Sequence, residues 1–315
     1  MRAHLVIGLV NNMPDGALQA TERQFEGLLA AAAGRLDVEL RLFSIAEVER
    51  GEHARAHMRG AYADAASLPA AGLDGLIVTG AEPRTTSLTD ETYWASLARL
   101  IDWTQDAQVP SLWSCLAAHA AVLRLDGVDR VQLHGKLSGV FACESAVGHP
   151  LLADAPTPAL APHSRLNGLV EADLIAAGYQ ILTRSEEVGV DAFVKPEPAP
   201  TLFFQGHPEY AAEALQREYL RDVARFLRGE RAAHPPAPTG YFDAATERAL
   251  RGLADTARRD PSRISDYAAA IERSQPVATW RPWAQGVYRN WLEAVRAHKA
   301  GRGPALAADA RKRAP

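Results

Sequence analysis

Short apolar runs alternate along the chain with segments in which apolar residues recur every three or four positions. HLVIGLV (4–10), LDGLIVTG (73–80), VPSLWS (109–114) and APTLFFQG (199–206) are apolar at most positions, which is typical of strands buried on both faces of a parallel sheet. The helical spacing predicts helices over 23–36, 91–107, 115–125 and 211–227.

This alternation of strands and helices predicts an α/β fold with a doubly wound, mostly parallel sheet. Residues 126–195 contain shorter and more strand-rich segments, and we expect an antiparallel excursion there. Ligands of doubly wound sheets bind outside the carboxyl ends of the strands. Candidate chemistry is therefore sought where the predicted strands end.

The same pattern suggests how the chain is divided. We expect one large domain over 1–233 and a linker over 234–242, which contains the proline-rich HPPAPTG. A C-terminal helical extension is expected over 243–299. Residues 300–315 lack a periodic apolar face, and we predict that they are disordered.

Composition narrows the class of protein. The chain has 315 residues, 47% of them hydrophobic and 23% charged, with a formal net charge of −4. Charges of both signs are interspersed, which argues against binding to nucleic acid or to an anionic membrane. Two cysteines cannot build a disulfide framework, there is no run of 18 apolar residues, and the N-terminus reads as a strand rather than a signal peptide. We predict a cytoplasmic protein.

Three chemically reactive residues follow predicted strands directly. Cys115 lies in LWSCLAAHAAVL (112–123), where a strand turns into a helix, and a thiolate at a helix N-terminus is stabilised and reactive. His207 and Glu209 follow another strand in FFQGHPEY. A strand-end cysteine, a strand-end histidine and a nearby carboxylate can serve as nucleophile, base and orienting group.

Backbone N–H groups near Gly80 and Leu116 are expected to form an oxyanion hole, because glycine lets a backbone donor approach closely. Alternatives stay open. Free cysteine is often buried, so Cys115 could fill a core, as we expect for Cys143. His119, four residues after Cys115, is a rival base, although its helix should carry it away from the pocket. Glu209 could be a solvated loop charge.

Several motifs in order resemble one known family. They are NNMPDGALQATERQF, GLIVTGA followed by YW, KLSGV (136–140), APHSR (161–165), GHPEY (206–210), EYLRD (218–222) and TWRPWAQGVYRNWL near the C-terminus. These stretches resemble the homoserine O-acyltransferases of the homoserine O-succinyltransferase family, relatives of the class I glutamine amidotransferases. The resemblance runs over about 4–227 and again near 279–295.

The resemblance implies acyl transfer from an acyl-CoA to the γ-hydroxyl of L-homoserine, a step towards methionine. Cys115 would be the acylated nucleophile, His207 the general base and Glu209 the group that holds it. The expected partners are these small-molecule substrates, with no nucleic acid and no membrane. No metal or bound cofactor is expected, since acyl-CoA is a co-substrate. The oligomeric state is left open, with a homodimer as one alternative.

The resemblance also implies substrate-binding residues. Lys136 and Ser164 match positions of the substrate pocket, and Arg221 matches the arginine that binds the amino acid's carboxylate. An arginine fork suits a carboxylate, but Arg221 could also be a surface residue and Lys136 a solvated loop charge. Other activities stay open: L-serine as acceptor, a glutaminase or amidotransferase, or a non-catalytic binding protein on the same fold.

Arg84, in VTGAEPRTTSL, occupies the position that separates acyl donors in the resembling family. Glycine there goes with succinyl transfer and glutamate with acetyl transfer, and arginine is neither. We predict succinyl-CoA as donor, because an arginine attracts the distal carboxylate and can pair with it. Two alternatives are an arginine that fills the acyl pocket and leaves room for acetyl only, and one that turns outward to the CoA phosphates.

Overall fold

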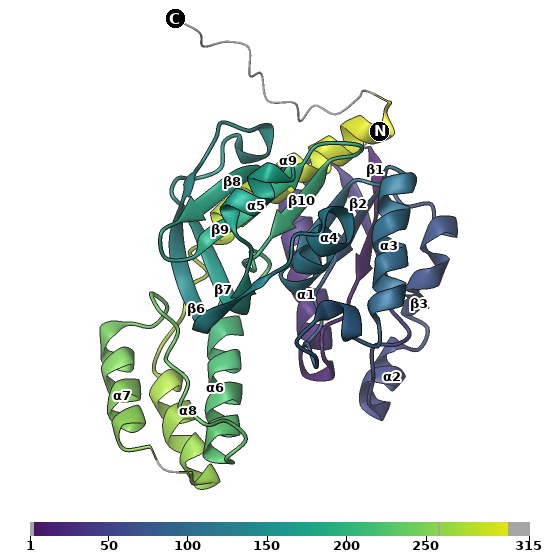
Figure 1. Ribbon diagram of the computed structural model, residues 1–315. Coiled ribbons are helices and arrows are strands. Elements are labelled where there is room, and N and C mark those ends of the chain that lie inside the picture. The colour runs from purple at the N-terminus through teal and green to yellow at the C-terminus, as the bar shows by residue number, and fades with distance from the viewer. Residues whose placement is uncertain (1–2, 258, 302–315) are drawn as a thin grey trace, which may run out of the picture.

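One mixed sheet forms the centre of the protein (Figure 1). The computed structural model describes residues 3–257 and 259–301. Within them, ten strands pair in the order β3-β2-β1-β4-β5-β10-β9-β8-β6-β7. The parallel strands are β1 (His4–Val10), β2 (Asp37–Ser44), β3 (Tyr62–Asp64), β4 (Gly75–Val78), β5 (Ser111–Ser114) and β10 (Thr201–Phe204). The antiparallel ones are β6 (Val131–Ser145), β7 (Ala159–Gly168), β8 (Gln180–Ser185) and β9 (Gly189–Lys195).

Helices cover both faces of the sheet. The helices of the described residues, not all of which touch the sheet, are α1 (Asp15–Ala32), α2 (Glu52–Met58), α3 (Trp94–Asp106), α4 (Leu116–Asp126), α5 (Glu171–Ala176), α6 (Ala214–Leu227), α7 (Ala244–Asp255), α8 (Ile264–Glu272) and α9 (Arg281–Lys299). Alternate residues of β1 point to opposite faces, so Leu5 and Ile7 pack with Trp291 in one core, and Val10 packs with α3 and α4 in the other. This is the doubly wound arrangement that the apolar pattern predicts.

The predicted strands and the antiparallel excursion are confirmed, and two details differ. The first helix begins at Asp15 rather than at residue 23, because Pro14 suits the start of a helix and Asp15 places a carboxylate in the first turn. Strand β2, DVELRLFS, was not predicted, since only its last two residues are fully buried and its apolar signal is weak.

The C-terminal third packs in two places. Figure 1 shows α7 and α8 beside α6, where Leu250, Tyr267 and Val223 share a core. Helix α9 instead returns to the sheet and packs against α1. Thr239, in the expected linker, exchanges backbone hydrogen bonds of 2.8 and 2.9 Å with β6. The domain boundaries stay a prediction, and residues 302–315 of the predicted tail lie outside the described residues.

Across residues 3–257 and 259–301, every helix is either too short or too polar to cross a membrane.

Candidate active site

Cys115 lies on a sharp turn between β5 and α4. Its φ of 53° and ψ of −115° are unusual for a residue with a side chain, and such a backbone costs about 1–3 kcal/mol, so surrounding structure must hold it. Part of that support is a hydrogen bond of 2.7 Å that the Cys115 N–H donates to the Phe204 carbonyl of β10. The turn leaves the thiol partly accessible at the N-terminus of α4.

His207 and Glu209 lie on the loop after β10. The His207 N–H donates to the Pro162 carbonyl at 2.7 Å, and its ring stacks on Tyr210 with centroids 4.2 Å apart. Nδ1 of His207 lies 2.9 Å from Oε1 of Glu209. Gly206 has to be a glycine, because a Cβ there would come within 2.7 Å of Asp191 Oδ1.

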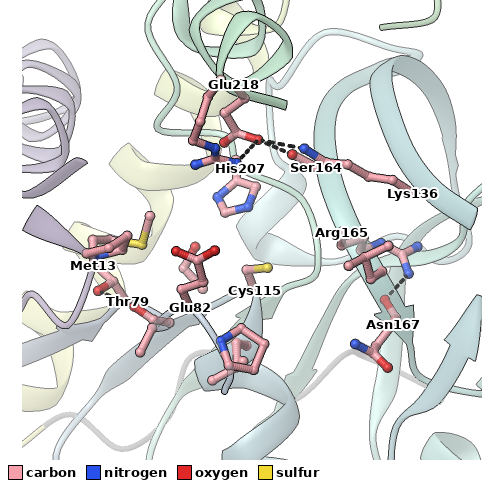
Figure 2. A pocket seen from close by; sticks show the side chains of 18 of the residues that line it. Met13, Thr79, Glu82, Cys115, Lys136, Ser164, Arg165, Asn167, His207 and Glu218 are labelled. Carbon is pink, nitrogen blue, oxygen red and sulfur yellow. Dashed lines mark hydrogen bonds and ion pairs between the residues drawn. The ribbon is translucent and has the colours of Figure 1, made fainter. Parts of the chain in front are cut away.

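The thiol, the imidazole and the carboxylate form one electrostatic unit. Burial alone would lower the pKa of His207, but a charged Cys115 sulfur and the Glu209 carboxylate raise that pKa well above its ordinary value. The raised pKa favours the protonated imidazolium form of His207, and Glu209 orients its ring. Figure 2 shows Cys115 and His207 facing the same space, within a cavity of about 740 Å³.

Gly80 and Leu116 meet beside the thiol. A Cβ on Gly80 would lie 2.9 Å from the Leu116 Cβ and 3.1 Å from its nitrogen, so only glycine allows β4 to end this close to α4. Leu116 is the first residue of α4, and neither its N–H nor that of Gly80 donates to another described group. Both donors are available for an oxyanion. The term strand-end wall is used below for Cys115, His207, Glu209, Gly80 and Leu116.

The opposite side of the cavity carries charges from β6, β7 and α6. Lys136 Nζ lies 2.8 Å from Asp222 Oδ2 and 3.2 Å from Glu218 Oε2. The hydroxyl groups of Ser164 and Tyr210 also donate to Glu218, and Figure 2 shows the Lys136 and Ser164 contacts as dashed lines. The term α6 wall is used below for Lys136, Ser164, Glu218, Arg221 and Asp222.

Glu218 is the centre of the α6 wall. Burial alone would raise the pKa of Glu218, but Lys136 and the two hydroxyl donors hold that pKa below its ordinary value. Sequence reasoning missed Glu218, although it begins the EYLRD stretch. Its position one helical turn before Arg221 is the signal that could have found it.

Arg221 lines the same cavity and is the least constrained cation of the α6 wall. Its side chain is 44% exposed, and its nearest carboxylate oxygens lie 3.5 Å away on Asp222 and 3.8 Å away on Glu218. The guanidinium is therefore charged, accessible and only loosely paired, which suits a site for an incoming carboxylate.

The structure does not bring Arg84 to the cavity. Its guanidinium is 62% exposed and lies 2.6 Å from Glu49, in the loop after β2. The reason lies in its own backbone, because the N–H groups of Arg84 and Thr85 both donate to the buried Glu91, at 2.7 and 2.8 Å, and this turn directs the side chain outward. The predicted pairing of Arg84 with an acyl carboxylate is at odds with this placement.

The rival residues occupy structural positions. His119 is buried and lies 3.0 Å from Gln205 Oε1, and burial lowers the pKa of His119 to about 3, so it is neutral at physiological pH. Cys143 is fully buried in β6, and burial raises the pKa of its thiol far above the ordinary value. Neither residue is suited to activate or form a nucleophile at neutral pH.

In residues 3–257 and 259–301, no group of three or more His, Cys, Asp or Glu side chains is arranged to hold a metal ion.

The fold, a mostly parallel sheet with helices on both faces, is that of the class I glutamine amidotransferase-like proteins. In agreement, the crystal structure of a glutamine amidotransferase from Methylobacillus flagellatus matches with a TM-score of 0.52, at 16% identity, over 93% of this chain and 95% of that one. At this identity the likeness concerns the fold alone.

The sequence comparisons are more specific. The family described as homoserine O-succinyltransferase matches residues 2–300. A protein named homoserine O-succinyltransferase from Methylorubrum extorquens is 47% identical over 94% of this chain and 88% of its own length. One of the same name from Rhodopseudomonas palustris is 48% identical over 91% of this chain and 86% of its own length. The chain belongs to the homoserine O-succinyltransferase family, which is a family of acyltransferases.

Proposed function

We propose that this protein transfers a succinyl group from succinyl-CoA to the hydroxyl of L-homoserine through a thioester on Cys115. The observation that carries the proposal is one cavity lined by Cys115, by the hydrogen-bonded pair His207–Glu209 and by Arg221. The names of the relatives from Methylorubrum extorquens and Rhodopseudomonas palustris support the same reaction.

In the first half-reaction, the Cys115 thiolate attacks the thioester carbonyl of succinyl-CoA. A carbon–sulfur bond forms, and the negative charge on the carbonyl oxygen is stabilised by the N–H groups of Gly80 and Leu116. The bond to the CoA sulfur then breaks. The CoA thiolate takes a proton from the His207 imidazolium, leaving a succinyl-enzyme and a neutral imidazole ready to act as base.

In the second half-reaction, L-homoserine binds against the α6 wall. Its carboxylate pairs with the accessible guanidinium of Arg221, and its ammonium group faces the carboxylate of Glu218. His207 takes the hydroxyl proton as the oxygen attacks the acyl carbonyl. The carbon–sulfur bond to Cys115 breaks, which restores the thiolate–imidazolium pair. No metal or resident cofactor takes part in these steps.

Intact-protein mass spectrometry tests the proposal. Mixing the protein with succinyl-CoA alone should add the mass of one succinyl group, and adding L-homoserine should remove it. The adduct should be absent from Cys115→Ala and retained in the matched variant Cys143→Ala. The proposal fails if turnover occurs without an adduct, if acetyl-CoA or L-serine replaces the named substrate with higher kcat/KM, or if glutamine is hydrolysed in its place.

A further inference from the structure

The cavity is lined by several cationic side chains, and the proposed reaction assigns a role only to Arg221. Those that line it are Arg130, Lys136, Arg165, Arg221, Arg225 and Arg231. Four of them have carboxylate partners within 4 Å. Lys136 and Arg221 pair within the α6 wall, Arg225 lies 3.0 Å from Glu82, and Arg231 lies 3.1 Å from Asp222. Arg130 and Arg165 lack a carboxylate partner at ion-pair distance among the described residues.

Each of the three guanidinium nitrogens of Arg165 donates a hydrogen bond. Its Nε donates to His163, Nη1 donates to the Asn167 carbonyl at 2.7 Å, and Nη2 donates to the Val188 carbonyl. The residue is only 5% exposed. Its guanidinium is held by these three neighbours on β7 and before β9. Arg165 is therefore a fixed positive charge in the wall of the cavity rather than a fork open to a second ligand.

Arg130 is the opposite case. It lies between α4 and β6, is half-buried, and makes one side-chain hydrogen bond within the described residues, from Nη2 to the Thr86 carbonyl at 3.0 Å. Its Nε and Nη1 groups donate to no described residue. A guanidinium has five N–H donors, so most of the donors of Arg130, which lines the cavity, have no acceptor among the described residues.

The carboxylates nearest to Arg130 do not neutralise it directly. Asp129 and Glu91 act on its charge, but neither lies within 4 Å, and Glu91 Oε1 already accepts from the backbone of Arg84 and Thr85. Burial lowers the pKa of Arg130, in keeping with the lack of a described carboxylate within 4 Å of its guanidinium. A half-buried cation with spare donors is suited to bind an anionic ligand.

We propose that Arg130, and not Arg84, binds the distal carboxylate of the succinyl group. This inference rests on the proposed function. Arg130 and Cys115 line the same cavity, and two methylene groups separate the thioester carbon of a succinyl group from its carboxylate. The loop that presents Gly80 to the oxyanion also carries Thr86, whose carbonyl holds Arg130. The guanidinium binds the carboxylate through its unused edge. Arg130 is a specificity-determining residue in this assignment.

The test compares three donors: succinyl-CoA, butyryl-CoA, which has the same chain length without the charge, and acetyl-CoA. The wild type should prefer succinyl-CoA. Arg130→Met should lower kcat/KM for succinyl-CoA at least about tenfold, because a charge-assisted pair is lost, and change the other two donors less than about threefold. Arg130→Lys keeps the positive charge but not the bidentate fork. Its kcat/KM for succinyl-CoA should therefore lie between those of the wild type and of Arg130→Met.

Arg124→Met is the matched control, because Arg124 lies in the last turn of α4, the helix that precedes Arg130, but is exposed and pairs with Asp102. It should leave all three donors unchanged. Equal losses for all donors in Arg130→Met would overturn the inference, since they would place Arg130 on the CoA phosphates or on the support of Glu91. An unchanged succinyl-to-butyryl ratio in Arg130→Lys would also overturn it, even if Arg130→Met does not fold. Failure of the wild type to use succinyl-CoA would instead contradict the proposed function.

Discussion

The two walls of the cavity are built by different means. The strand-end wall is positioned by the main chain. Cys115 has a positive φ, and the backbone N–H groups of Cys115 and His207 donate hydrogen bonds to β10 and β7. Gly80 has no side chain, which lets the end of β4 touch the start of α4. The α6 wall is positioned by side chains that neutralise one another, and Arg221 remains 44% exposed.

The difference separates two tasks. Reacting atoms must be held within a few tenths of an ångström, and the ladder of a buried sheet provides that rigidity. Recognition of a charged substrate needs accessible, movable charges, and a helix face at the cavity edge provides those. Changes in the strand-end wall should therefore lower kcat, whereas changes in the α6 wall should raise KM for the acceptor.

The largest effect is expected at Cys115. Cys115→Ser should lower kcat on the order of 10³-fold or more, because a hydroxyl beside the same imidazole is a far poorer nucleophile there. Cys143→Ala should keep most activity, since Cys143 lies in the core of β6. Steady-state kinetics with CoA release measures both. Similar losses in the two variants would show that the strand-end wall holds a structural thiol.

A change in the α6 wall should act on binding instead. Arg221→Lys should raise KM for L-homoserine by about 10- to 100-fold, which corresponds to about 1.5–3 kcal/mol for a charge-assisted hydrogen bond. A point charge cannot reproduce the bidentate fork. The CoA released in a single turnover without acceptor should be nearly unchanged. An equal fall in that half-reaction would make Arg221 a structural residue and remove the contrast between the walls.

The α6 wall should also make stability depend on acid pH. Burial alone raises the pKa of Glu218 and of Asp222, but Lys136 and the other donors hold both pKa values below their ordinary ones. A lowered folded-state pKa favours the folded state when the group is ionised. The contribution is therefore complete above about pH 5 and is lost as pH falls through the folded-state pKa values.

Urea unfolding from pH 7 down to pH 3.5 measures this contribution. The unfolding midpoint of the wild type should fall more steeply with acid than that of Glu218→Gln, which has lost one of the titrating groups. Glu26→Gln, at an exposed position of α1, is the control and should follow the wild type. Parallel curves for the wild type and Glu218→Gln would mean that Glu218 adds nothing to acid sensitivity.

The smallest effect is expected outside both walls, at Arg84. Because its guanidinium is exposed and paired with Glu49, Arg84→Glu should change the succinyl-to-acetyl ratio of kcat/KM less than about threefold. A pairing of Arg84 with the acyl carboxylate, as expected from the sequence, would instead make Arg84→Glu weaken or reverse the preference for succinyl-CoA. A reversal would show that the loop after β4 rearranges when the acyl donor binds.

Much of the fold and part of the site could be predicted locally. Continuous apolar runs predicted β1, β4, β5 and β10, because strands buried on both faces need them. Cys115, His207 and Glu209 could be named because each follows such a strand, and parallel strands end at one edge of a sheet. Gly80 and Leu116 could be named for the same reason, because each lies directly after the end of a predicted strand. The structure places all five residues at that edge.

The directions and partners of charged side chains required the tertiary structure. The sequence by itself determined β1, β4, β5 and β10, the helices that follow them, the family and the strand-end residues, since apolar periodicity and motifs are local properties. The outward turn of Arg84, the open fork of Arg130, the cluster around Glu218 and the return of α9 to the sheet were decided only on folding. The physical reason is that an ion pair depends on distance in space, and the Lys136–Glu218 and Arg84–Glu49 pairs join segments that no local pattern relates.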